Sequence, residues 1–327
     1  MMPLRNLTPF AFLALLGAGA WFGGVWTFAA AVATPLCLAV LDGVLGEDRA
    51  AADPSGAARW LPRAYVVLQL AVTAWAATLV ATRSASFLES LGLALSAGVT
   101  TGVFGFVAGH ELIHGRSPRE RALGLLFLGS VFYMHFRIAH LHGHHTRAGT
   151  LEDPATARLG EGLYAFLLRS VGGQFREAWQ FETHRRRGNR MIGYLAIEAA
   201  LLLVLALLSW RALLFILAVA TIAVVLLEGF NYIAHYGLLR REGERLGPHH
   251  SWNSRRRMNN AALLNMGRHS DHHRHAARSY EALEQLPAAA ELPCGYAGAL
   301  LTALVPPLWR RLMDGRAEAV MLKASRI

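Results

Sequence analysis

The chain has 327 residues, of which 54% are hydrophobic and 17% are charged, and its mean hydropathy is +0.32. Soluble domains average about 45–50% apolar and about 25% charged residues, so this composition excludes an ordinary soluble enzyme. The net charge of +10 comes from arginines spread over several loops rather than along one face, and we therefore expect no nucleic-acid partner.

The first apolar segment, residues 7–41, contains no charged residue over 35 positions. One membrane-spanning helix needs about 20 residues, and Gly23 and Gly24 near the middle predict a turn between two short helices. A cleavable signal peptide is the alternative. It is disfavoured because only Arg5 precedes the segment as a basic residue and because a signal-peptide core has about 7–15 residues.

Four more apolar segments follow along the chain, at 64–82, 91–109, 191–210 and 212–230. Together they predict six transmembrane helices in three hairpins, about 7–41, 64–109 and 191–230. The hairpin turns lie near Gly23, Arg83 and Arg211. Placing these turns outside leaves all but Arg83 and Arg211 of the 32 Lys+Arg on the cytoplasmic side, with both termini.

The polar remainder, about 110–190 and 235–327, predicts a helical cytoplasmic cap on one embedded domain, 1–327, with the lipid bilayer as a partner. Residues 122–136 are apolar but too few to cross a membrane, so they predict a buried or re-entrant segment. Strand signals are nearly absent. The fold class is therefore an all-α integral membrane protein.

Three groups of histidines recur at helical spacing, i to i+3 or i+4, and we expect each group to converge on one point. The groups are His110 with His114, His140 with His144 and His145, and His269 with His272 and His273. Eight imidazoles exceed the four ligands of one zinc, and nitrogen donors without thiolates suit iron, copper or zinc, with two irons favoured. The first group also matches HExxH, but a metalloprotease would leave the other two groups unused.

A fourth element lies at the end of the last apolar segment, where Glu228, Asn231 and His235 share one helical stripe. Ionisable groups at membrane depth usually face a polar interior site, which makes His235 a further candidate ligand. Glu228 and Asn231, with Glu111 and Asp271, are candidates for orienting the metal-bound imidazoles from behind. The alternative for the carboxylates, with equal weight, is that they are exposed or form salt bridges and do not orient an imidazole.

The other histidines are expected not to bind metal. His135 is expected to be interfacial and His142 and His275 to point away, whereas solvated loop positions are expected for three more, His184, His249 and His250. The two cysteines, Cys37 and Cys294, can form neither a disulfide framework nor an iron–sulfur module. Electrons must therefore come from a separate protein.

At these residues the chain resembles the bacterial membrane alkane monooxygenases, within the fatty acid desaturase and hydroxylase superfamily. The resemblance rests on the three histidine groups and on the segments Arg268–His273 and Asn231–Leu238. It extends to Leu41-Asp42, Gly46-Glu47-Asp48, Glu152-Asp153-Pro154, Leu292–Tyr296 and Pro307–Arg310, and so covers most of the chain.

The resemblance implies a non-haem di-iron site, six transmembrane helices and O2-dependent hydroxylation of a hydrophobic substrate, a medium-chain alkane to a 1-alkanol. It implies a bacterial inner-membrane location with a cytoplasmic active site. The electron carrier would be rubredoxin or a ferredoxin with its reductase. The implied iron ligands are His110, His114, His140, His144, His145, His235, His269, His272 and His273.

Three positions depart from the resembled pattern. Ala139 and Ala234 stand where glutamate usually precedes a histidine, and Gly115 stands where lysine often follows the first group. These changes bear on the substrate more than on the metal ligands. The alternatives are a fatty acid desaturase or hydroxylase, or an alkylaromatic methyl hydroxylase, with the same site. A metal transporter is disfavoured because most of the candidate ligands lie beyond the ends of the spans.

Overall fold

A computed structural model describes residues 4–82, 84–185, 188–241 and 243–325. Apart from two strands of two residues each, the regular structure of these residues is helical, which confirms the all-α class. The chain divides into two compact units, each assembled from three separated stretches. Unit 1 comprises Met1–Cys37, Ala57–His135 and Arg185–Leu227, and unit 2 comprises Leu38–Gly56, Phe136–His184 and Glu228–Ile327. A single embedded domain stays a prediction.

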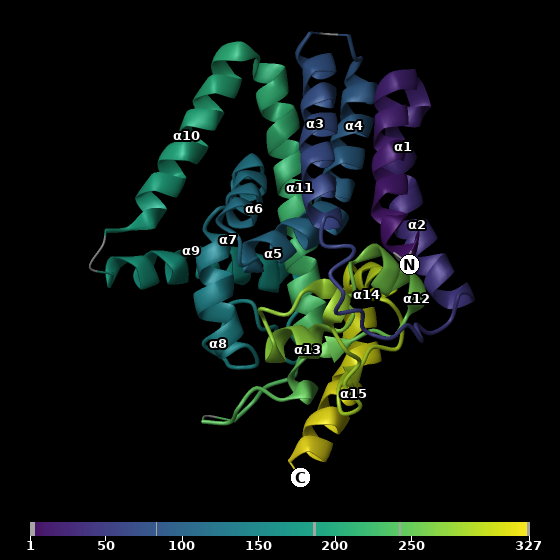
Figure 1. The fold of residues 1–327 in the computed structure, drawn as a ribbon, viewed down its shortest axis with the longest axis vertical. Coiled ribbons are helices and arrows are strands. Elements are labelled where there is room, and N and C mark those ends of the chain that lie inside the picture. Colours follow the sequence, from purple (N-terminus) through teal and green to yellow (C-terminus); the bar gives the residue numbers. More distant parts are fainter. Residues whose placement is uncertain (1–3, 83, 186–187, 242, 326–327) are drawn as a thin grey trace. The chain divides into compact units, whose positions relative to one another are not determined.

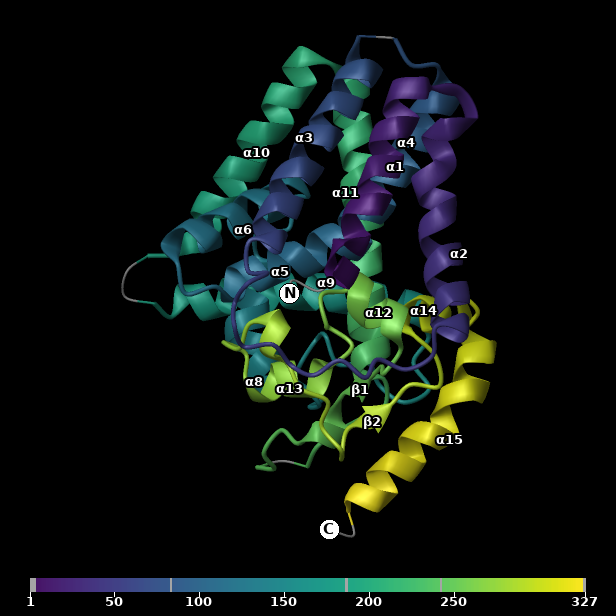
Figure 2. The ribbon, with the colours of Figure 1, turned by 45° about the vertical axis from the view of Figure 1, so that its right-hand side comes forward.

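Unit 1 contains most of the long apolar helices. Helices α1, α3 and α4 lie side by side within it (Figures 1 and 2). Its elements are α1 (Thr8–Phe22), the start of α2 (Ala29–Val44), α3 (Leu61–Ala81), α4 (Phe87–Thr100), α5 (Phe106–His114), α6 (Pro118–Ser130), α10 (Arg190–Leu208) and most of α11 (Trp210–His235).

Five helical stretches of the described residues are long and apolar enough to cross a membrane. They are Gly24–Val44, Leu61–Ala81, Phe87–His114, Arg190–Leu208 and Trp210–His235. The sixth predicted span is not among them, because α1 has only 15 residues and is too short to cross a membrane alone. The predicted turn at Gly23 and Gly24 is confirmed by φ angles of 68° and 55°. The turn predicted near Arg83 lies outside the described residues, and the last one falls at Ser209, between α10 and α11.

The helix that carries the first histidine group runs without a break from Phe87 to His114, over 28 residues. Its middle turn, Thr101–Gly105, is π-helical. Gly98 and Gly102 face α11 so closely that an added Cβ would lie 2.7 Å from Ile222 and 2.8 Å from Leu226. Small residues allow helices in membranes to approach in this way, and they fix this helix against α11.

The last turns of this helix pack against α6. An added Cβ on Gly105 or Gly109 would lie 2.8 Å or 2.5 Å from the ring of Phe127, which is fully buried. Ser117 begins α6 with a capping box to Glu120, satisfying two backbone N–H groups that the helix leaves unpaired. The predicted buried or re-entrant segment 122–136 is mostly this helix.

Unit 2 holds shorter elements. Strands β1 and β2 pair in parallel, with Trp252 opposite Ala290 and Asn253 opposite Glu291 (Figure 2). The elements are α7 (Phe136–Ile138), α8 (His145–Arg147), α9 (Leu163–Thr183), β1 (Trp252–Asn253), α12 (Arg257–Ala262), α13 (His269–Arg274), β2 (Ala290–Glu291), α14 (Tyr296–Ala303) and α15 (Pro306–Ala324), besides the ends of α2 and α11.

Buried polar contacts hold the third histidine group in unit 2. Arg268, 1% exposed, directly precedes α13 and donates to the Ala50 carbonyl at 2.7 Å and to the Asp48 carboxylate at 3.2 Å. Asp42 accepts a hydrogen bond from the Asn259 backbone N–H at 2.7 Å. A buried guanidinium is costly unless it is paired, so these bonds specify where segment 38–56 lies against the chain that leads into α13.

Candidate metal centre

The second histidine group lies on a π-helical turn, Ala139–His144, between α7 and α8. A π-helix closes i to i+5, so it aligns residues five apart rather than four. The Nε2 atoms of His140 and His145 accordingly lie 3.0 Å apart, and His144 joins a different set of rings. The expectation that each group converges on one point was wrong here, because it assumed α-helical periodicity.

Four histidines of unit 2, the four-histidine cluster, bring their side chains together. They are His144, His235, His269 and His273, all 8% exposed or less. The Nε2 atoms of His235, His269 and His273 lie 3.1 Å from one another in all three pairs. His269 and His273 stand four apart on α13, whereas His272 between them turns to another set. The third group, like the second, is thus divided between two sets.

This arrangement fits a bound metal ion. Metal–imidazole bonds of about 2.1 Å at right angles place two nitrogens about 3.0 Å apart. Three Nε2–H groups aimed at one another would clash, whereas one cation can accept all three lone pairs. His144 Nε2 is buried, and no described residue offers it a hydrogen bond. Burial and the neighbouring histidines keep the pKa of His273 well below its ordinary value, so the ring is neutral and able to bind metal.

Asp153 supports this cluster from behind. Its Oδ2 lies 2.8 Å from His144 Nδ1 and also accepts the Thr156 hydroxyl at 2.7 Å, and its Oδ1 accepts the Ala155 N–H at 3.0 Å. Burial would raise the pKa of Asp153, but the His144 ring and the Thr156 hydroxyl outweigh it and lower the pKa. An ionised carboxylate on Nδ1 leaves the Nε2 lone pair of His144 for a metal.

Sequence reasoning did not assign this role to Asp153, which entered only within the Glu152-Asp153-Pro154 segment. The signal available was a carboxylate in a turn nine residues after His144. His235 has a similar support, because its Nδ1 lies 3.3 Å from the backbone carbonyl of His250. Backbone carbonyls cannot be recognised from side-chain chemistry.

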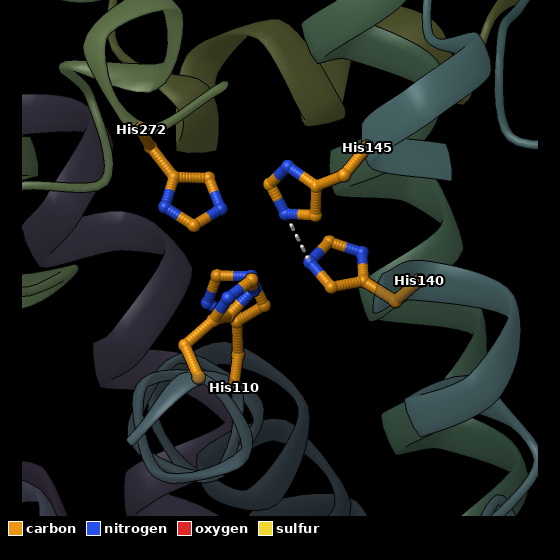
Figure 3. Close-up of side chains that lie close together, drawn as sticks. His110, His140, His145 and His272 are labelled. Carbon is orange, nitrogen blue, oxygen red and sulfur yellow. Dashed lines mark hydrogen bonds between the residues drawn. The ribbon is translucent and has the colours of Figure 1, made fainter. Parts of the chain in front are cut away.

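Three further histidines of unit 2, the three-histidine cluster, are His140, His145 and His272. One nitrogen of each lies within 4.8 Å of the others. The rings of His145 and His272 are 4.8 Å apart, and Figure 3 shows all three rings turned inward. His140 and His272 are buried and His145 is half-buried. Three imidazoles leave a metal short of a full set of ligands.

The first group lies in unit 1, at the end of α5. The rings of His110 and His114 are 4.6 Å apart, as residues four apart on a helix should be. His110 is 8% exposed and His114 is half-buried. The pair offers two neighbouring imidazoles to one ligand site.

The candidates for orienting imidazoles have varied surroundings. Glu228, fully buried, accepts hydrogen bonds from Ser170 at 2.6 Å and Gln174 at 2.9 Å, and Asn231 lies 3.4 Å away. Asp271 binds groups that are not candidate ligands: His275 at 2.9 Å, Arg278 at 2.8 Å and the backbone N–H of Glu284. The salt-bridged alternative therefore holds for Asp271. Glu111 is half-buried on α5.

The histidines that were expected not to bind metal have surroundings of their own. His142 is exposed and stacks on Phe181 at 4.6 Å, and His184 is exposed with its Nδ1 on the Gln180 carbonyl. His135 lies beside Tyr133, and burial lowers its pKa to about 4. Among the described residues none of these three belongs to a group able to hold a metal.

His250 was expected in a solvated loop, but its side chain is fully buried. It gathers with His249 and Glu244. Its Nδ1 accepts the Gly247 N–H at 2.8 Å, so in the neutral ring Nε2 carries the proton and faces the Glu244 carboxylate at 3.4 Å. An Nε2 that carries a proton does not bind a metal. The Gly247 hydrogen bond and the nearby Glu244 carboxylate therefore account for the position of the His250 ring.

Comparison with known proteins shows the family of the chain. The sequence model of the family "Fatty acid desaturase" matches residues 86–303. Alkane 1-monooxygenase 2 of Pseudomonas aeruginosa is 37% identical over 305 residues, covering 86% of this chain and 81% of that protein. Alkane 1-monooxygenase of Pseudomonas putida is 40% identical over 260 residues, covering 75% of this chain and 64% of that protein.

A more distant relative carries a different name. The xylene/toluene monooxygenase hydroxylase component XylM of Pseudomonas putida is 29% identical over 312 residues, covering 90% of this chain and 83% of that protein. The match to the desaturase model takes in all three histidine groups, and the 37% relative extends over nearly the whole chain. The chain therefore belongs to the alkane 1-monooxygenase family, a branch of the fatty acid desaturase family, and is a membrane-bound oxidoreductase.

Proposed function

We propose that the protein is an O2-dependent non-haem di-iron monooxygenase that converts a medium-chain alkane to a 1-alkanol. The observation that carries the proposal is the set of three Nε2 atoms at 3.1 Å in the four-histidine cluster. The proposed activity is that of the alkane 1-monooxygenases that are 37–40% identical to this chain. One O2 and two electrons with two protons would give the alcohol and water.

The ligand assignment that we propose has two parts. His144, His235, His269 and His273 would hold one iron. His140, His145 and His272 would hold the other, completed by His110 and His114. Nitrogen donors without thiolates suit iron. The division follows the two sets of rings within unit 2, and the addition of His110 and His114 follows from their paired rings and the need for more ligands.

When bound, the irons would supply the activation of O2 and the attack on an unactivated C–H bond. The protein's own residues would fix the rings and exclude water. Asp153 would hold the proton on His144 Nδ1, and the His250 carbonyl would hold it on His235 Nδ1, leaving each Nε2 for metal. The four-histidine cluster is buried, so bulk water would not compete with the substrate.

The substrate class rests on the relatives and on the membrane helices, which would allow a water-insoluble chain to enter from the bilayer. A second candidate is hydroxylation of a methyl group on an aromatic ring, favoured by the 29% identity to XylM over 90% of the chain. A desaturase would use the same site and remove a second hydrogen.

A panel of substrates tests the function. Purified, iron-loaded protein would be supplied with medium-chain alkanes, fatty acids and alkylaromatics, an electron donor and 18O2, and the products analysed by mass spectrometry. We expect a labelled 1-alkanol and close to two irons per chain. A double bond would select the desaturase, a benzylic alcohol as the main product would select the second candidate, and one zinc without iron would overturn the assignment.

We further propose that rubredoxin or a ferredoxin, with its reductase, delivers electrons at the cytoplasmic side of the inner membrane, where both termini would lie. The support is a net charge of +10 and the lack of a cysteine cluster. Steering between exposed charges weakens as the Debye length falls from about 10 Å at 0.1 M salt to about 3 Å at 1 M. Turnover at limiting carrier should therefore fall steeply with salt, and much less at saturating carrier. Indifference to salt would contradict the docking.

A further inference from the structure

Three oxidisable rings pack together in unit 2 where α11 ends. The ring centres of Tyr232 and Tyr236 are 5.2 Å apart, and Trp309 of α15 lies 5.4 Å from Tyr236 and 5.8 Å from Tyr232. All three side chains are fully buried. Tyr236 directly follows His235, a member of the four-histidine cluster. The rings therefore begin one residue from a candidate metal ligand.

The two phenols have different partners. Tyr232 donates to the backbone carbonyl of Glu161 at 2.6 Å, which is an ordinary way to satisfy a buried hydroxyl. Tyr236 instead donates to the carboxylate of Asp314 at 2.5 Å and accepts the Gly160 N–H at 3.0 Å. A phenol loses an electron much more readily when its proton can leave at the same time. Asp314 provides the base that this requires.

Different side chains beside Tyr236 can carry its proton and its electron. Asp314 is half-buried on α15, so a proton taken from Tyr236 can pass on to solvent. Trp309 is in contact with both tyrosines, and its buried Nε1 finds no hydrogen-bond partner among the described residues. An indole that cannot release its N–H proton forms a radical cation when it loses an electron. This cation takes an electron from a neighbouring phenol, so the indole transfers electrons without staying oxidised. The oxidised state should therefore rest on Tyr236.

We propose that Tyr236, with Trp309 and Tyr232, is a one-electron relay that reduces the metal centre when it is oxidised without substrate. The proposal rests on the proposed function, which supplies the oxidant. Tyr236 gives one electron to the oxidised centre and its phenolic proton to Asp314, leaving a neutral phenoxyl radical and a protonated carboxyl. An electron from the carrier or an added reductant then restores the phenol, and the proton returns from Asp314.

The test is made with full-length, iron-loaded protein. The reduced enzyme is exposed to O2 without alkane, frozen at intervals and examined by electron paramagnetic resonance, with and without ring-deuterated tyrosine. We expect an organic radical signal that narrows with the deuterated tyrosine and is lost in Tyr236→Phe. Asp314→Asn keeps the phenol but should lower the radical yield several-fold. Tyr164→Phe is the matched control, because Tyr164 is exposed and its hydroxyl donates to the Leu304 carbonyl rather than to a carboxylate.

A second measurement distinguishes a role of Tyr236 in electron transfer from a purely structural role in packing. With alkane present, Tyr236→Phe should keep its initial rate within about twofold, but without alkane it should lose activity several-fold faster than the wild type, in step with oxidation detected on nearby peptides. An unchanged radical in Tyr236→Phe, or no radical in wild type that holds iron and forms alcohol, would overturn the relay. Protein without iron or product would overturn the proposed function as well.

Discussion

The two histidine clusters of unit 2 differ in how they are built. Every histidine of the four-histidine cluster belongs to unit 2 and is buried, and the Nδ1 atoms of two of them face Asp153 and the His250 carbonyl. The three-histidine cluster includes the half-buried His145, and in the proposed site it needs His110 and His114 from unit 1. In the proposed site, one metal is thus held by residues of a single compact unit, whereas the other also uses two histidines of a membrane helix. Their metals should respond differently to substitution.

Neighbouring residues on α13 provide the largest test, because His272 and His273 turn to different clusters. We expect His272→Ala and His273→Ala each to abolish hydroxylation, beyond the ~10–100-fold typical of residues behind the ligands. Each variant should retain about one iron, and the Mössbauer spectra of the two remaining irons should differ. His275→Ala is the control. Identical spectra from the two variants would contradict the division into two clusters.

A smaller effect is expected behind the ligands. Asp153→Asn replaces the acceptor on His144 Nδ1 by an amide that can donate, so we expect activity and iron retention against a chelator to fall by ~10–100-fold. The iron lost first should be that of the four-histidine cluster. Asp271→Asn is the matched control, since Asp271 binds His275 and Arg278 rather than a ligand. Equal iron loss from both variants would remove the special role of Asp153.

The smallest effect concerns the helix of unit 1. An added Cβ on Gly109 would lie 2.5 Å from Phe127, so Gly109→Ala should overpack the contact between α5 and α6 and destabilise it by about 1–3 kcal/mol. The change should loosen the iron that uses His110 and leave the four-histidine iron in place. Thermal unfolding and Mössbauer spectra measure the two effects. Gly17→Ala, with open space around it, should show neither.

Much of the fold follows from hydrophobicity and spacing. Apolar runs located the spans, and Gly23 located a turn, because both depend on local properties of the chain. The turn at Gly23 also located the end of α1, but the 15 residues of this helix are fewer than the ~20 that one span needs, so counting it as a sixth span did not follow from its length. Histidine spacing marked eight of the histidines that lie close together, and the polar stripe at the end of the last apolar segment marked His235.

The division of the histidine rings between the two clusters could not be derived from sequence spacing alone. The π-helical turn Ala139–His144 changes which residues align, and no property of His140 or His144 as residue types announces it. His250 was placed at the surface because arginines surround it in sequence, yet its ring is buried by segments distant along the chain. The role of Asp153 likewise depends on a contact that only the folded chain creates.

The unbroken helix from Phe87 to His114 has a consequence for the lipid that surrounds the protein. At 1.5 Å per residue its 28 residues extend about 42 Å, against a hydrocarbon core of about 30 Å. Membrane helices answer hydrophobic mismatch by tilting, and a continuous helix carries that tilt to its far end. His110 and His114 sit at that end, so acyl-chain length in reconstituted vesicles should tune how firmly the proposed site that includes them holds its metal.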